Sequence, residues 1–145
     1  MSLDEEAVRA ANRAFYRAFE SLDLARMADV WADDDPLTCI HPNGPLAAGR
    51  EAVLDTWRII FANTEHMTFD VQAERIEVRG DLAWVVCTEV LHSTTVAGPA
   101  DGAVQATNVF RRQSGHWKVA HHHASPFVTA ARPARPAPAG KGVLH

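Results

Sequence analysis

The N-terminal segment carries its apolar residues at the spacing of an amphipathic helix. Over residues 4–22 they recur every three or four positions, and charged residues occupy the opposite face. Ser2 and Glu5 have the spacing of a capping box, in which each side chain binds the backbone N–H of the other residue. The pattern therefore predicts a long helix that begins just after Ser2.

The next segment alternates between short helices and a short strand. Asp23 can cap a second helix that presents apolar residues as far as Trp31. Residues 37–40 favour a short strand. Residues 41–45 favour a loop, because two prolines and a glycine cannot continue a hydrogen-bonded ladder. Residues 53–61 predict a third helix.

After residue 64 the apolar period changes from about four to two, which is typical of strands. The alternation over residues 67–73 resumes in the opposite phase at Ile76, which indicates a bulge near Glu74. Residues 82–96 are apolar on both faces, which predicts a central strand covered on both sides. Short turns separate this segment from two more strands, over residues 103–112 and 116–125.

Helices followed by a four-strand antiparallel meander predict an α+β fold, with the helices packed on one face of a curved sheet. One domain over residues 1–127 accounts for the periodic part of the chain. The Pro/Ala-rich residues 128–145 predict an extended C-terminal tail.

Composition and charge exclude several classes of protein. A net charge of −4 disfavours a nucleic-acid binder, which needs concentrated positive charge. No apolar run approaches the roughly 18 residues of a membrane span, and the acidic N-terminus has no signal core, so we expect a cytoplasmic protein without a membrane partner. Cys39 and Cys87 form no metal-type pair and are expected to be free thiols.

Three stretches resemble the nuclear transport factor 2-like superfamily, in its SnoaL-like branch. They are "ESLDLARMADVWADD", "CIHPNGPLAAGREAVLDTWRIIF" and "TNVFRRQSGHWKVAHHHASP". The last is also similar to the end of the association domain of calcium/calmodulin-dependent kinase II. The resemblance implies a cone-shaped, cystatin-like fold in which three helices and the concave sheet face enclose a pocket. It also implies a homodimer that pairs through the convex face. The superfold hosts isomerases, cyclases, dehydratases, hydrolases and assembly domains, so fold alone does not give function.

The resemblance to ketosteroid isomerases implies positions for a site. His41-Pro42 takes the place of their Asp-Pro pair, which makes His41 the candidate general base or acid. Asn108 takes the place of an acidic oxyanion donor. Their catalytic tyrosine corresponds to Phe15, with Tyr16 about 100° further round the helix, which argues against steroid isomerisation.

The run His121-His122-His123 must divide between two faces, because neighbouring strand residues alternate. On pattern alone, His121 and His123 share the phase of Trp117 and Val119 and would face the core. The resemblance instead implies that Ala120, His122 and Ala124 face the pocket. Trp117 and Val119 would then lie on the convex side, buried in a dimer interface.

A metal site is the competing interpretation of these histidines. His121 and His123 are two residues apart, and His41 or Glu89 could add a ligand. We expect no metal, because the paired histidines face away from His41 in the implied arrangement. Glu89 is then a buried or interface carboxylate with a partner.

The function hypothesis is a small-molecule pocket protein, a cofactor-independent isomerase, cyclase or lyase that uses acid–base chemistry on a small hydrophobic or polar organic ligand. His41, Asn108 and His122 are expected to line the largest pocket, with Trp57 and Phe110 as its apolar wall. The alternative is a non-catalytic ligand-binding or association module, which would keep wall residues without a titratable group.

Overall fold

A computed structural model describes residues 1–127 of the chain, and the predicted tail over residues 128–145 lies outside that part. Three helices precede most of the sheet: α1 (Leu3–Ser21), α2 (Leu24–Val30) and α3 (Arg50–Ala62). The predicted capping box is present, since Ser2 Oγ accepts from Glu5 N and Glu5 Oε1 accepts from Ser2 N. Asp23 caps α2 as predicted.

The strands form one sheet in the order β2-β1-β7-β6-β4-β3, with β5 paired to β4. Their bounds are β1 (Thr38–Ile40), β2 (Leu46–Ala48), β3 (Thr64–Arg79), β4 (Leu82–Thr95), β5 (Gly98–Pro99), β6 (Gly102–Gln113) and β7 (His116–Pro126). All pairs are antiparallel except β1 with β7. The predicted α+β fold, with helices on a curved and mostly antiparallel sheet, is confirmed. The short strand β2 and the parallel pair are additions that the pattern did not predict.

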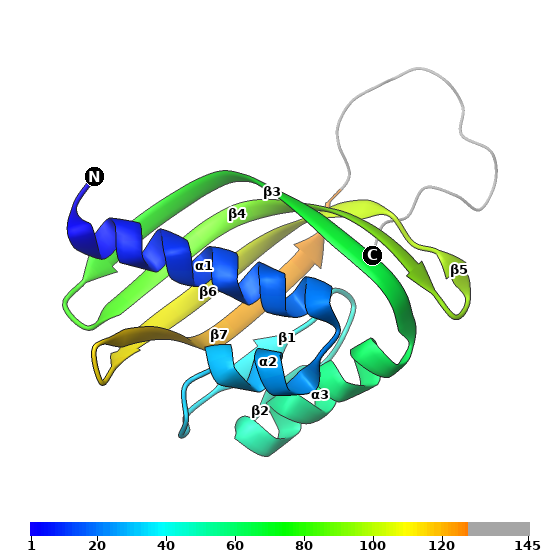
Figure 1. The fold of residues 1–145 in the computed structure, drawn as a ribbon, viewed down its shortest axis with the longest axis horizontal. Helices are drawn as coiled ribbons and strands as arrows, with labels where there is room; N and C mark the ends of the chain where they lie inside the picture. The colour runs from blue at the N-terminus through cyan, green and yellow to red at the C-terminus, as the bar shows by residue number, and fades with distance from the viewer. Residues whose placement is uncertain (128–145) are drawn as a thin grey trace.

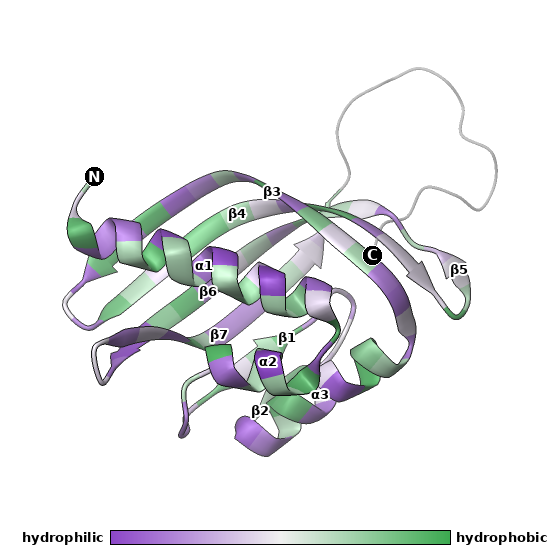
Figure 2. Ribbon diagram, in the orientation of Figure 1, coloured by the Kyte–Doolittle hydropathy of each residue, from purple (hydrophilic) through white to green (hydrophobic). Residues whose placement is uncertain are grey.

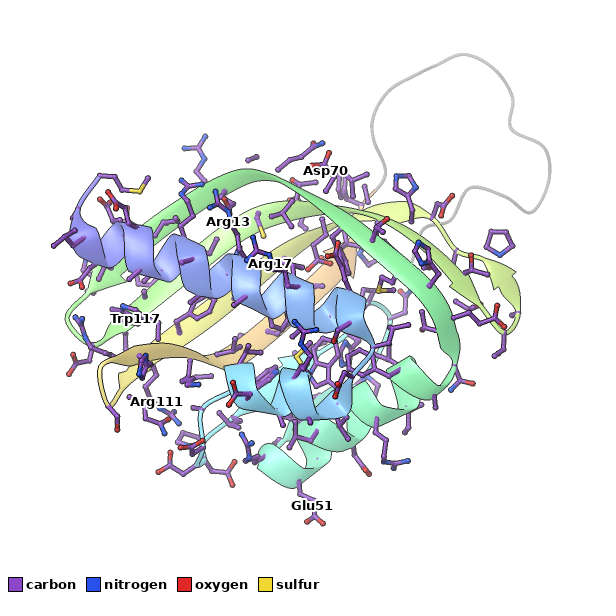
Figure 3. All side chains as sticks on the ribbon, viewed as in Figure 1. Arg13, Arg17, Glu51, Asp70, Arg111 and Trp117 are labelled. Atoms are coloured by element: carbon purple, nitrogen blue, oxygen red, sulfur yellow. The ribbon has the colours of Figure 1, made fainter. Side chains whose placement is uncertain are left out.

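The helices cover one face of the curved sheet. Helix α1 runs across the long strands, and α2 and α3 lie near the β1–β7 side of the sheet (Figure 1). Apolar and polar residues alternate along both the helix and the strands (Figure 2). On α1, Phe15 and Phe19 are buried, whereas Arg13 and Arg17 are exposed on the outer side (Figure 3). This amphipathic packing closes an interior between helices and sheet.

Within a single chain, strand β4 is covered on one face only, and the predicted cover of its other face by a second subunit stays a prediction. Its inward residues include Ala83, Val85, Cys87 and Glu89, all buried. The outward residues Leu82, Trp84 and Val86 are exposed by 50%, 37% and 39%. Both faces read as apolar in the sequence, but helices pack on only one of them.

Two bulges change the phase of the sheet. The predicted bulge near Glu74 is present, where the pairing of β3 with β4 shifts between Gln72 and Arg75. A second bulge was not predicted: Val109 pairs with His121 and Phe110 with Val119, so Ala120 is the extra residue.

The second bulge corrects the expected orientation of the start of β7. Trp117 and Val119 face the covered side, with 8% and 0% exposure, and are not on the convex face. Ala120 is only partly buried and does not share the phase of His122. Because the bulge inverts the alternation, Trp117 and Val119 before it and His122 and Ala124 after it all face the covered side of the sheet. Burial of Trp117 therefore no longer argues for a dimer.

Among residues 1–127, no helix has the length and apolar character needed to span a membrane. Cys39 and Cys87 are both buried free thiols, as predicted.

Candidate functional site

A cavity of about 260 Å³ lies between the helices and the inner face of the sheet. Its lining is mainly apolar and comes from helices, strands and the loop after β1. It consists of Phe19, His41, Pro42, Ile60, Met67, Phe69, Glu89, Leu91, His122 and Ala124. Three groups in this lining can exchange or share protons: two imidazoles and one carboxyl group. A small apolar cavity with a few convergent polar groups is typical of a ligand site.

His41 enters the cavity from the loop that follows β1, as the Pro-containing pattern favoured. Its Nε2 lies 2.9 Å from Thr56 Oγ1 and 3.4 Å from Cys39 Sγ. The Thr56 hydroxyl donates to Val53 O at 2.6 Å, so its oxygen accepts from His41 Nε2–H. Burial lowers the pKa of His41 to about 4, and the ring is therefore neutral at pH 7.

His122 lies inside the fold, as the resemblance implied, with 1% exposure. It pairs across strands with Asn108, and its Nδ1 lies 2.5 Å from Asn108 Oδ1. Burial, with His41 as the next contribution, holds the pKa of His122 well below its ordinary value. The ring centroids of the two histidines are 6.0 Å apart. The neighbouring rings of His121 and His123 point to the opposite face, where His121 Nδ1 lies 2.7 Å from Thr38 Oγ1.

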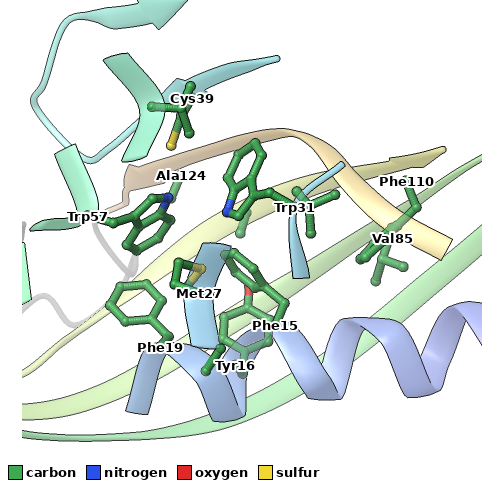
Figure 4. Close-up of a cluster of buried hydrophobic side chains, with 14 of the residues drawn as sticks. Phe15, Tyr16, Phe19, Met27, Trp31, Cys39, Trp57, Val85, Phe110 and Ala124 are labelled. Carbon is green, nitrogen blue, oxygen red and sulfur yellow. The ribbon is translucent and has the colours of Figure 1, made fainter. Parts of the chain in front are cut away.

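Three of the residues expected to line the pocket stand behind its lining. Asn108 is fully buried beneath His122. Trp57 packs against His41, with ring centroids 4.6 Å apart, and belongs to the aromatic core. Phe110 lies on the side of the apolar cluster away from Trp57 (Figure 4). The expected wall is therefore corrected: Phe19, Phe69 and Leu91 are among the apolar residues that form it.

The cavity that carries these histidines is also not the largest hollow, contrary to expectation. A groove of about 610 Å³ lies between α1, α2 and the start of β7. It is lined largely by the alanines of α1 together with Trp117 and Lys118. Neither His41 nor His122 lines this groove.

Glu89 was expected to be a buried or interface carboxylate, and it also lines the cavity. It is 3% exposed, and its Oε2 accepts a 2.5 Å hydrogen bond from the hydroxyl of Tyr16. Burial raises the pKa of Glu89 to about 7, although the Tyr16 hydrogen bond acts in the opposite direction. A charged residue among the apolar inward positions of β4 is the signal that could have selected it.

Tyr16 reaches the interior even though Phe15 occupies the position expected for a tyrosine. Its hydroxyl contacts Glu89 and also accepts from Asn108 Nδ2 at 3.1 Å. Both rings fit inside because α1 lies directly over the sheet, where side chains about 100° apart can reach different strands. Burial raises the pKa of Tyr16 well above its usual value, so the hydroxyl stays protonated.

Within residues 1–127, no three His, Cys, Asp or Glu side chains lie close enough together to bind a metal ion. The expectation of a metal-free site stays a prediction. The arrangement itself offers a carboxyl group that titrates near neutrality beside two neutral imidazoles, in an apolar enclosure. Such a set can move protons to and from a bound molecule.

The comparisons with known proteins agree with this architecture. A candidate dehydratase from the NTF2-like family of Streptomyces avermitilis is 38% identical, covering 87% of this chain and 97% of its own, with a TM-score of 0.81. A candidate calcium/calmodulin-dependent protein kinase type II association domain from Thiobacillus denitrificans is also 38% identical, covering 82% and 94%, with a TM-score of 0.72.

A curated plant relative extends the comparison. The F-box protein SKIP8 from Arabidopsis thaliana is 32% identical over 119 residues, which are 82% of this chain. The chain spans about half the length of that relative, 49%. The sequence model of the SnoaL-like domain family matches residues 8–129 of this chain. The three-helix and curved-sheet architecture and this match together confirm the resemblance read from the sequence: the chain belongs to the SnoaL-like family, with an NTF2-like fold.

Proposed function

We propose that the protein is a cofactor-independent acid–base enzyme, of isomerase, cyclase or lyase type, that acts on a small organic molecule. The observation that carries this proposal is the buried carboxyl group of Glu89, which lines the same cavity as His41 and His122. An association module needs no such group, because burying a carboxyl group in apolar surroundings costs free energy.

Glu89 is the proton-transfer group in this proposal, in place of His41. With its pKa raised to about 7 by burial, both its acidic and basic forms are populated near neutrality. His41, whose pKa burial lowers to about 4, is a weak base at the same pH. His41 and His122 then hold the ligand through neutral hydrogen bonds.

A lyase reaction that removes water suits this set of groups. A proton is removed from carbon, and the departing hydroxyl is protonated so that it leaves as water. Glu89 can perform both tasks in turn, because the proton that its carboxylate takes from carbon is the one that it passes to the departing hydroxyl, while the two neutral imidazoles hold the ligand. The 38% identical protein from Streptomyces avermitilis, a candidate dehydratase, supports this choice.

The test combines binding with turnover. One- and two-ring ketones, enones and β-hydroxy ketones are screened by ligand-detected NMR, and those that bind are assayed for isomerisation, cyclisation or loss of water. Glu89→Gln should keep binding and lower turnover by about 100-fold or more. Exposed Glu65→Gln is the matched control and should leave turnover unchanged. Turnover that survives Glu89→Gln would remove Glu89 from the mechanism.

The second candidate is a non-catalytic ligand-binding or association module. It is favoured by the 38% identity to a candidate kinase association domain. Under this alternative, compounds bind the cavity without being converted, and Glu89→Gln changes affinity alone. The same screen therefore separates the two candidates.

We also propose that the protein is a homodimer that pairs through the outer sheet face. Leu82, Trp84 and Val86 are exposed there, and Val109 pairs with Trp84 on the neighbouring strand. Sedimentation at micromolar concentration should show twice the 15.9 kDa of one chain. Trp84→Glu should give a monomer, whereas Ile59→Glu, at an exposed apolar residue on α3, should not. A wild-type protein that sediments only as the 15.9 kDa species would exclude this dimer.

A further inference from the structure

A chain of hydrogen bonds runs from Arg9 on α1 to His122 in the cavity lining. Arg9 forms an ion pair with Glu74, with Nη1 and Oε1 2.6 Å apart. Glu74 Oε2 accepts from Asn12 Nδ2 at 2.9 Å, and Asn12 Oδ1 accepts from Asn108 Nδ2 at 2.9 Å. Asn108 Oδ1 then faces His122 Nδ1.

The direction of every bond in this chain follows from its first acceptor. An ionised carboxylate can only accept, so Asn12 must turn its NH₂ group toward Glu74 and its oxygen toward Asn108. Asn108 must then present its own NH₂ group to Asn12 and its oxygen to His122. An amide oxygen has no proton to give, so His122 Nδ1 carries one.

A second arm fixes the same orientation of Asn108 independently. Asn108 Nδ2 also donates to the hydroxyl of Tyr16, which in turn donates its single proton to Glu89 Oε2. If the amide of Asn108 were reversed, its oxygen would face two acceptors, the Asn12 oxygen and the Tyr16 oxygen. The contacts of Asn108 with Asn12 and with Tyr16 therefore give its amide the same orientation, and with it the same tautomer of His122.

The remaining nitrogen of His122, Nε2, has no hydrogen-bond partner among residues 1–127. His122 lines the cavity, whereas Asn108 behind it does not. Within residues 1–127, the fully buried side-chain nitrogen and oxygen atoms that lack a partner are the indole nitrogens of Trp31 and Trp57. His122 Nε2 makes no hydrogen bond in this part of the chain, so it is the ring nitrogen left to bind a ligand.

We propose that Asn108 is a positioning residue that holds His122 as the neutral Nδ1–H tautomer, so that Nε2 accepts a hydrogen bond from an uncharged ligand carrying an O–H or N–H group. The ligand class rests on the proposed function of the cavity, whereas the tautomer does not. Among residues 1–127, no Lys or Arg lines the cavity, so this part of the chain offers an anionic ligand no counter-charge.

The tautomer is tested by long-range ¹H–¹⁵N NMR on protein labelled in its histidines, at pH 7.5. The His122 signals are assigned by their loss in His122→Asn. The wild-type ring should show a protonated Nδ1 and an unprotonated Nε2. Asn108→Leu should move the proton to Nε2, because Nδ1–H would lose its acceptor.

The matched control is Asn12→Leu, which makes the same change of side chain in the same network. It should leave the His122 tautomer unchanged, because the Tyr16 arm still orients Asn108. A wild-type spectrum with the proton on Nε2 overturns the proposal whether or not the Asn108 variant folds. Loss of the tautomer in Asn12→Leu would equally overturn the assignment to Asn108.

The ligand class is tested with two pairs of probes that differ in one donor: indole with benzofuran, and 2-naphthol with its methyl ether. In each pair, the compound with an N–H or O–H group should bind about tenfold more tightly than its partner and shift the His122 Nε2 signal. Equal binding within each pair would overturn the ligand class alone. Failure of all four probes to bind would overturn it together with the small-molecule function, while the tautomer is judged on the ligand-free spectrum.

Discussion

Glu89→Gln should stabilise the protein by about 3 kcal/mol at pH 8 and leave its stability at pH 4 almost unchanged. Burial raises the pKa of Glu89 from 4.5 to about 7, and each pKa unit corresponds to about 1.4 kcal/mol. At pH 8 the folded protein therefore holds a buried negative charge, which costs free energy that the same group does not cost in the unfolded chain. Glutamine stays neutral in both states, and its oxygen can still accept from Tyr16.

The pH window follows from the direction of this shift. Between pH 4.5 and about 7 the folded state binds more protons than the unfolded state, so wild-type stability falls as the pH rises through that range. Urea unfolding of both proteins at several pH values measures the difference. Exposed Glu65→Gln serves as the control and should shift stability little at any pH. A constant difference between Glu89→Gln and wild type would mean that Glu89 is not buried as a neutral acid.

His41→Gln should protect the protein against acid by about 2 kcal/mol at pH 5. The pKa of His41 is about 4 in the folded state because of burial, against 6.5 in the unfolded chain. The unfolded chain therefore takes up a proton first as the pH falls. The stability that His41 contributes is complete above pH 6.5 and is lost progressively toward pH 4. The glutamine amide can replace Nε2–H as the donor to Thr56.

The measurement is the difference in unfolding free energy between the variant and wild type at pH 7.5 and at pH 5. The comparison with wild type isolates His41, because Glu89 contributes equally to both proteins. His66→Gln, at an exposed position on β3, is the control. If His41→Gln and wild type lose the same stability on acidification, His41 is hydrated rather than buried.

Much of the fold follows from short-range pattern. Capping by Ser2 and Asp23 depends on residues two or three positions away, so the sequence alone predicts where α1 and α2 begin. The change of apolar period after residue 64 predicts strands, and the phase change near Glu74 predicts the first bulge. These signals are local, and packing did not override them.

The second bulge shows where local pattern fails. Trp117 and Val119 alternate regularly with their neighbours, and nothing in their own segment indicates that Ala120 is an extra residue. The bulge exists in the register between β6 and β7, where Val109 pairs with His121 and Phe110 with Val119. Only the partner strand decides it. The resemblance gave the correct face for His122 but the wrong face for Trp117.

The sequence by itself determined the α+β fold class, the starts of α1 and α2 and the first bulge, because those depend on spacing along the chain, whereas the resemblance selected His41 and His122. Only the tertiary structure decided which groups share the cavity. Tyr16 and Glu89 are 73 positions apart, and Asn12 and Asn108 are 96 apart. Their contacts arise because α1 lies across β4 and β6, and the titration of Glu89 follows from the burial that this packing creates.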